Sequence, residues 1–219
     1  MNVIITGSTG MVGKGILFEC MDHPAVEKIL IINRKSLGLN HSKVSELILP
    51  NFMDISNHKD MLVGYDACFY SMGISSLGKN EETYSAITFD ITKRFADTLF
   101  DLNQNLVFNY VSGSGTDSSE SGKVMWGRVK GKTENYILNK GFGDAYMFRP
   151  GAIIPERGIK SSTGWVNFIL ILFSPFYFLM RKSSHVTTTT KIGQAMIQTV
   201  KNSMELKHLE NKNINQIVG

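Results

Sequence analysis

The first fifteen residues, MNVIITGSTGMVGKG, constrain the fold of this chain more than any other stretch. Val3, Ile4 and Ile5 are consecutive β-branched residues, which is typical of a strand buried on both faces. Beyond the glycines, apolar residues recur at helical spacing between residues 12 and 21, so a helix begins near Met11. A buried strand that leads through a glycine-rich turn into a helix predicts the first βα unit of a parallel sheet.

Three glycines with the spacing G-x-x-G-x-x-G separate this strand from this helix. Gly7 permits a tight turn, Gly10 lets the backbone approach a pyrophosphate, and Gly13 lets the helix pack closely on the strand. The helix N-terminus adds free N–H groups and the positive end of a dipole. An ordinary tight turn is the alternative, but the strand–turn–helix context favours a dinucleotide site. The candidate contacts are Gly7, Thr9, Gly10, Met11, Val12 and Gly13.

Predicted strands and helices alternate along the rest of the chain. Strands are expected at 28–32, 46–49, 67–71, 106–111 and 145–148, and a final short one at 214–218. Helices are expected at 84–102, 124–138 and 190–200. This alternation predicts an α/β fold, a doubly wound parallel Rossmann sheet flanked by helices. We expect one dinucleotide-binding domain, 1–219, in which a small C-terminal substrate-side segment, 152–189, precedes the last helix.

The end of the second predicted strand bears on the choice of dinucleotide. Asn33 lies twenty residues beyond Gly13, where folds that bind NAD usually place an acidic residue for the ribose 2′-hydroxyl. Here Asn33 is followed by Arg34 and Lys35, whose positive charges suit the 2′-phosphate of NADP. A solvated strand end rich in basic residues is the alternative. We predict NADP as the cofactor, with Arg34 and Lys35 as contacts.

Two further strand ends supply candidate cofactor contacts. Asp54 follows the third predicted strand, where an acidic residue can reach the adenine amino group; a role in capping a short helix is the alternative. Ser71, Met72 and Gly73 follow the fourth strand, and the carboxyl ends of strands are where doubly wound sheets bind ligands.

Composition excludes several classes of function. The net charge of +4 comes from 23 basic and 19 acidic residues spread along the chain, so we expect no nucleic-acid partner. The two cysteines, Cys20 and Cys68, are expected to be reduced core residues. The histidines are scattered without metal-ligand spacing, so no metal site is predicted. No charged region precedes the first apolar run, and we therefore predict a cytoplasmic protein.

Two stretches have open interpretations. Residues 165–180, WVNFILILFSPFYFLM, form the most apolar run, but a helix of this length spans only about 24 Å of a bilayer core of roughly 30 Å. A packed helix near the substrate, a homodimer contact and peripheral membrane contact are the alternatives. Residues 112–123, SGSGTDSSESGK, predict a mobile loop that is either a lid or simply exposed.

Several motifs together resemble those of the short-chain dehydrogenase/reductase superfamily, and within it the small atypical extended, epimerase-like members. They are TGSTGMVG at 6–13, NRK at 33–35, YVSGSG at 110–115, VKGKTE at 129–134 and FRPGAIIPER at 148–157. The resemblance covers nearly the whole chain and is looser after residue 158. It implies a Rossmann sheet with a reduced C-terminal region, and Pro150 as a further cofactor contact.

The resemblance also implies a catalytic Ser, Tyr and Lys, the last two as Y-x-x-x-K on one helical face. Lys130 matches the Lys, which holds the nicotinamide ribose, while Ser112 and Ser114 remain alternatives for the Ser. Trp126 stands where the superfamily has Tyr. An indole N–H only donates and does not titrate in the useful range, so it cannot replace the phenol as a general acid.

Two functions are compatible with this departure. The first is an NADP-dependent oxidoreductase or epimerase-like enzyme with a modified site that acts on a small, hydrophobic or planar substrate. The second is a binding protein similar to the nitrogen-metabolite-repression regulators of the superfamily, which hold the dinucleotide without turning it over. Trp126 supports the second function, and Lys130 with the two serines supports the first.

Overall fold

The structure is a computed structural model that describes residues 1–160, 177–181 and 183–219. The strands are β1 (Asn2–Thr6), β2 (Lys28–Asn33), β3 (Val44–Ile48), β4 (Ala67–Tyr70), β5 (Val107–Val111), β6 (Asp144–Arg149), β7 (Ala152–Ile154), β8 (Val186–Thr188) and β9 (His208–Glu210). The helices are α1 (Met11–Asp22), α2 (Lys59–Leu62), α3 (Glu81–Ser85), α4 (Ile91–Leu102), α5 (Met125–Leu138), α7 (Tyr177–Met180), α8 (Thr189–Lys201) and α9 (Asn211–Ile217).

The described residues form a seven-stranded parallel sheet in the order β3-β2-β1-β4-β5-β6-β9. This confirms the predicted α/β Rossmann fold. The chain runs outward from β1 to β3, then returns to the other side of β1 and continues from β4 to β9. The order therefore reverses between β1 and β4. Because all the strands are parallel, their carboxyl ends lie at one edge, and ligands of such sheets bind where the order reverses.

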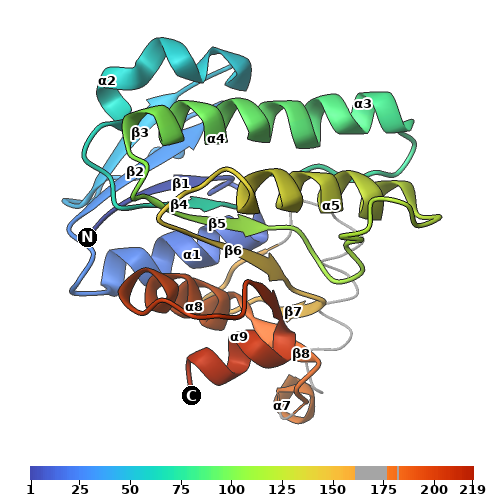
Figure 1. The fold of residues 1–219 in the computed structure, drawn as a ribbon. Helices are drawn as coiled ribbons and strands as arrows, with labels where there is room; N and C mark the ends of the chain where they lie inside the picture. Colours follow the sequence, from blue (N-terminus) through green and yellow to red (C-terminus); the bar gives the residue numbers. More distant parts are fainter. Residues whose placement is uncertain (161–176, 182) are drawn as a thin grey trace.

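The sheet has helices on both faces (Figure 1). Helices α3, α4 and α5 cover one face, and α1 and α8 cover the other. Alternate residues of β1 point to opposite faces, as the strand period requires. Ile4 packs in the core with Phe95 and Leu99 of α4, whereas Val3 and Ile5 pack with residues of α1 and α8. Both sides of the central strands are buried, which explains their continuous apolar sequence.

The predicted helix 84–102 is two helices joined by a π-helical turn. Helix α3 ends at Ser85, the turn covers Ala86–Asp90, and α4 continues to Leu102. A wider turn of this kind adds a residue and shifts the apolar positions that follow it. Tyr84 before the turn and Phe95 and Leu99 after it are nevertheless all buried, so the apolar side of the predicted helix continues across the turn.

The C-terminal region differs from the sequence prediction. Residues 211–217 form helix α9, not a strand at 214–218, and the short strand β9 precedes them at His208–Glu210. Glu210 and Asn213 form a reciprocal capping box that begins this helix. Ile214 is buried against the α1 and α8 side of the sheet. The helix that follows the segment 152–189 is therefore α8, and it is not the last helix of the chain.

The segment 152–189 begins and ends in two strands that pair with each other. β7 and β8 form a separate parallel pair, with Ala152 opposite Val186 and Ile154 opposite Thr188. Of the apolar run 165–180, residues 165–176 lie outside the described residues, and 177–180 form α7. Within the described ranges, no helix has the length and apolar character needed to cross a membrane.

Candidate functional site

The glycine turn brings β1, α1 and β4 into backbone contact. Gly7 adopts a φ of +72°, and a Cβ on it would lie 2.7 Å from the carbonyl carbon of Ser71. A Cβ on Gly13 would lie only 2.2 Å from the carbonyl oxygen of Gly7. The Oγ of Ser71 donates to the carbonyl of Thr6 over 2.7 Å. The turn has room for glycine alone at positions 7 and 13, as the sequence predicted.

A cleft of about 800 Å³ lies at the carboxyl ends of β1, β2 and β4. Its lining includes eight predicted cofactor contacts: Gly7, Thr9, Gly10, Arg34, Lys35, Ser71, Met72 and Gly73. It also includes Pro50 and Phe52, which sequence reasoning did not single out as contacts. Proline and phenylalanine after a third strand give an apolar wall, a signal that was available in the sequence. Met11, Val12, Gly13, Asp54, Lys130 and Pro150 are not among the lining residues.

Asp54 lies in a 3₁₀ helix beside the cleft. The helix covers Phe52–His58, and its first N–H groups are capped by Asn51, whose side chain accepts from the Met53 amide at 3.1 Å. Asp54 is exposed in the first turn of this helix. Asn51 is therefore the cap of this helix, and the contact of Asp54 with an adenine amino group stays a prediction.

The two serines have different surroundings after β5. Ser112 is buried, and its Oγ donates to Oε1 of Glu134 over 2.5 Å. Ser114 is exposed, and its amide donates to the carbonyl of Pro150 over 3.0 Å. The Ser112 hydroxyl is therefore committed to a partner inside the protein, whereas the Ser114 hydroxyl is accessible to a ligand.

Lys130 and Trp126 lie on α5, the helix that follows the serine-containing loop. The Nζ of Lys130 donates to the backbone carbonyl of Ser112. Burial lowers the pKa of this ammonium to about 8, against the attraction of Glu134. The Trp126 ring packs against the loop, since a Cβ on Gly115 would lie 3.0 Å from its Cη2.

Neither Trp126 nor any tyrosine is among the described residues that line the cleft. Tyr110 is buried in the core, and burial raises its pKa. Tyr136 donates from its hydroxyl to Asp97, and it lines a different hollow beside Lys132 and Lys140. Neither phenol is placed to exchange a proton with a ligand in the cleft.

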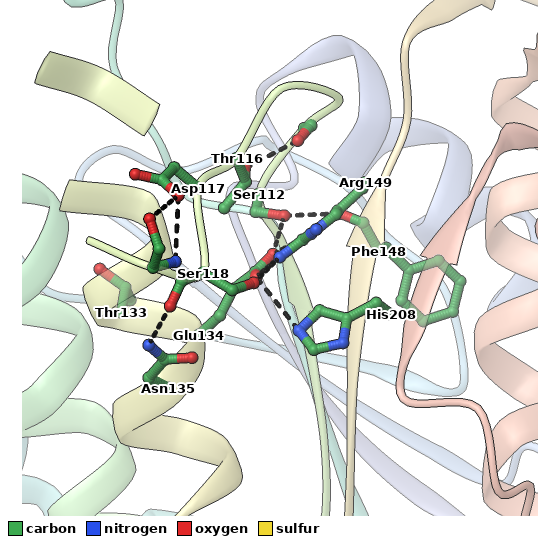
Figure 2. A network of polar contacts seen from close by, with 12 residues as sticks. Ser112, Thr116, Asp117, Ser118, Thr133, Glu134, Asn135, Phe148, Arg149 and His208 are labelled. Carbon is green, nitrogen blue, oxygen red and sulfur yellow. Dashed lines mark hydrogen bonds and ion pairs between the residues drawn. The ribbon is translucent and has the colours of Figure 1, made fainter. Parts of the chain in front are cut away.

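Sequence reasoning missed a buried ionic network at the carboxyl ends of β5 and β6 and the first residue of β9 (Figure 2). The carboxylate of Glu134 has no exposed surface and accepts from Ser112 and from Arg149, whose Nε lies 3.0 Å from Oε1. Nε2 of His208 lies 3.5 Å from the same carboxylate, and burial and Arg149 lower the pKa of His208. The spacing of Lys130 and Glu134 places both on one side of the helix, but only the fold brings Arg149 and His208 against this carboxylate.

The loop 112–123 packs on α5 through several contacts, and its mobility stays a prediction. A Cβ on Gly131 would lie 1.7 Å from the carbonyl oxygen of Asp117, so the loop backbone lies directly on the helix. Asn135 donates to the carbonyl of Ser118 over 2.9 Å, and Arg149 donates to the Ser118 hydroxyl. Asp117 also accepts from the Gly122 amide at 2.7 Å.

Comparison with known proteins gives distant relatives. No protein-family model matches the chain. Protein FMP52, mitochondrial, from Candida albicans is 27% identical over 174 residues, which cover 77% of this chain and 73% of that protein. Protein HTATIP2 from Rattus norvegicus is 23% identical over 168 residues, covering 75% and 68%. The name of the fungal relative places that protein in mitochondria, so a cytoplasmic location stays a prediction for this chain.

Solved epimerase structures share the fold. ADP-L-glycero-D-manno-heptose-6-epimerase from Helicobacter pylori aligns with a TM-score of 0.71 at 15% identity, covering 99% of this chain and 79% of that one. UDP-glucuronic acid 4-epimerase from Bacillus cereus, in complex with NAD, aligns with a TM-score of 0.69 at 14% identity, covering 96% and 78%. The chain therefore has the Rossmann-like α/β fold of these epimerases, a parallel sheet flanked by helices on both faces.

Proposed function

We propose that this protein binds NADP(H) in the cleft at the carboxyl ends of β1, β2 and β4. The observation that carries the proposal is the pairing of two walls in one cleft: the glycine turn Gly7–Gly10 and the basic pair Arg34 and Lys35. The glycine wall suits a pyrophosphate, and the basic wall suits a 2′-phosphate. One NADP molecule carries both phosphate groups, so a single ligand accounts for both walls of the cleft.

The residues present fit a dinucleotide. The N-cap residue of helix α1 is Gly10, which has no side chain to cap the helix, and no acidic residue lies in the first turn. The positive end of this helix is therefore open to phosphate. The volume of about 800 Å³ falls within the range of small-molecule sites. Several proteins of the same fold, including the Bordetella bronchiseptica enzyme WbmH, have been solved in complex with NAD+ or NAD.

The preference for NADP over NAD rests on the end of β2. Asn33 is buried there and carries no charge that would repel a phosphate. Arg34 and Lys35 are exposed in the cleft wall, and none of the ion pairs among the described residues involves either of them. Two unpaired cations beside the ribose favour a phosphate over a hydroxyl.

For the reaction, we propose an oxidoreductase or epimerase-like enzyme with a modified proton-transfer group. A bound nicotinamide supplies hydride transfer. Lys130 lies outside the cleft lining, and the superfamily resemblance gives it the role of holding the ribose; its pKa of about 8 would let the amine exchange a proton near neutral pH. Ser114 is the accessible hydroxyl that orients a substrate oxygen. A small, hydrophobic substrate suits the apolar C-terminal region.

A binding protein without turnover is the second candidate, and Trp126 favours it. This residue stands four positions before Lys130 and packs on Gly115, and it offers no titratable group at this position. Such a protein would pass the state of the dinucleotide to a partner.

Binding is tested by titrating the purified protein with NADPH and with NADH. We expect tighter binding of NADPH, and we expect Arg34→Ala to remove most of the difference, roughly tenfold or more for a charge-assisted contact. Lys14→Ala, which removes a cation from α1 outside the cleft lining, serves as the control. Equal affinities of the native protein for both nucleotides would remove the argument for NADP.

Turnover separates the two candidates. The native protein is incubated with NADPH and a panel of aldehydes, ketones and quinones, and NADPH oxidation is followed by absorbance. Turnover that is lost in Lys130→Ala supports the enzyme. No turnover in the native protein, with activity appearing in Trp126→Tyr, supports the binding protein.

A further inference from the structure

The last residue of β2 connects the glycine turn to strand β3 through its side chain. The Oγ of Ser8 donates to Oδ1 of Asn33 over 3.0 Å, and Nδ2 of Asn33 donates to Oε1 of Glu46 over 3.1 Å. Asn33 is 2% exposed, so this bridge is inside the protein. The amide at this position therefore links the glycine turn to strand β3.

Glu46 also holds the segment that follows Asn33. Its Oε2 accepts from the Ser36 hydroxyl over 2.5 Å, and its Oε1 accepts from the Leu37 amide over 3.0 Å. The same Ser36 oxygen accepts from the Gly38 amide over 3.0 Å, which closes a tight turn. One carboxylate on β3 therefore anchors both the end of β2 and the turn beyond it.

Arg34 and Lys35 lie between these two anchors. They are the two residues of this segment whose side chains are exposed and line the cleft as cations. Asn33 before them and Ser36 after them both donate to Glu46. Their backbone is thus fixed at both ends by one acceptor, while their side chains have no hydrogen bond or ion pair of their own within the described part of the chain.

We infer that Glu46 is a positioning residue for cofactor choice, which sets the Arg34–Lys35 backbone so that both cations face the 2′-phosphate. This inference rests on the proposed NADP function and deepens it. Binding is stronger when the groups that meet a ligand are already ordered, because less conformational freedom is lost on binding. The effect should be confined to the nucleotide that carries the 2′-phosphate.

The negative charge of Glu46 is stabilised by the hydrogen-bond donors around its carboxylate. Burial favours the neutral acid, but hydrogen bonds from Ser36, Asn33 and Leu37 outweigh it and hold the pKa of Glu46 below its ordinary value. The carboxylate is therefore ionised at neutral pH. A free carboxylate beside a 2′-phosphate would repel it, so the positioning model and a charge model predict opposite effects for its removal.

The test measures the dissociation constants of NADPH and NADH for the full-length native protein, Glu46→Ala and Glu46→Gln. We expect Glu46→Ala to weaken NADPH binding about tenfold and to change NADH binding less than twofold. Glu46→Gln keeps an oxygen acceptor, and its amide group donates to Ser36 instead, so it should keep the NADPH preference. A merely structural role would move both constants together.

The matched control is Asp144→Ala. Asp144 also accepts several hydrogen bonds, from Tyr146 at 2.5 Å and from Lys207 at 2.6 Å, but it begins β6 and so lies at the opposite edge of the sheet. We expect it to leave the ratio of the two constants unchanged. Should Glu46→Ala fail to fold, Ser36→Ala removes one anchor without altering the sheet and should reduce the same ratio.

The outcomes separate the inference from the function on which it rests. A native protein that prefers NADPH, with the preference lost in Arg34→Ala but kept in Glu46→Ala and Ser36→Ala, overturns the inference alone. Tighter NADPH binding in Glu46→Ala and Glu46→Gln would instead show that the charge opposes the phosphate, which also overturns it. A native protein without preference removes the NADP proposal and this inference together.

Discussion

Arg149 donates from Nε to Oε1 of Glu134 over 3.0 Å, and the carboxylate that it meets has no exposed surface. The pair joins the end of β6 to α5, and Ser112 at the end of β5 donates to the same carboxylate. A buried ion pair contributes little over an apolar pair of the same size, but loss of one partner leaves an uncompensated charge. The Glu134 carboxylate therefore holds the ends of β5 and β6 against helix α5.

We expect Glu134→Ala to lower the free energy of unfolding by about 3–5 kcal/mol, because the Arg149 guanidinium loses its buried partner. Urea denaturation followed by circular dichroism measures this. Glu81→Ala is the control, since Glu81 pairs with Arg128 at the surface and its loss should have a much smaller effect. Equal losses in the two variants would show that Glu134 is solvated in solution.

The stability contribution of Lys130 should depend on pH. Burial lowers its pKa from 10.5 in the unfolded chain to about 8 in the folded protein. Between these values the unfolded chain binds a proton that the folded protein does not, so stability rises with pH. The unfolding free energy of the native protein relative to Lys130→Met should thus increase from pH 8 to pH 10.5, by up to roughly 3 kcal/mol. A flat difference over this range would mean that the amine is hydrated.

Gly13 and Gly73 should respond differently to the same substitution. Gly13→Ala places a methyl group 2.2 Å from the carbonyl oxygen of Gly7, and the backbone must move to relieve it. We expect a loss of about 1–3 kcal/mol or more, with weaker binding of both nucleotides. Gly73→Ala meets no described atom within 4 Å and should leave the melting temperature nearly unchanged. Thermal melts of the two variants provide the comparison.

Both cysteines should be protected from thiol reagents. Cys20 and Cys68 have no exposed surface, and burial raises the pKa of both thiols. We expect no reaction with Ellman's reagent at pH 8 in the native protein and two reactive thiols in denaturant. A thiol that reacts quickly in the native protein would contradict the packing of α1 or of β4.

The sequence predicts the nucleotide half of the fold well because local signals agree there. A β-branched strand, glycines and a helix follow each other within twenty residues, and each supports the same βα unit. The cleft brings together Thr9, Arg34 and Ser71 as expected, since parallel strands end at one edge. These positions follow from order along the chain and need no knowledge of side-chain packing.

Features that depend on distant contacts were missed. Glu134 is one of several charged residues in VKGKTE, and only the fold brings Arg149, fifteen residues later, against it. Residues 214–218 look like a short strand, but Glu210 and Asn213 cap a helix there, and glutamate is an uncommon cap residue. The loop after β5 has the composition of a mobile segment, yet Gly127 and Gly131 of α5 let its backbone lie on the helix.

That last contact decides where foreign sequence can be inserted for engineering. The serine-rich loop would be the obvious choice for a tag or a fused domain, but an insertion beside Asp117 would lift the loop from Gly131 and separate Ser118 from Arg149. Residues 74–80, which lie beyond the cleft residue Gly73 and before α3, are the better choice, because Leu77 within them is 85% exposed. A fusion there should leave the α5 side of the site assembled.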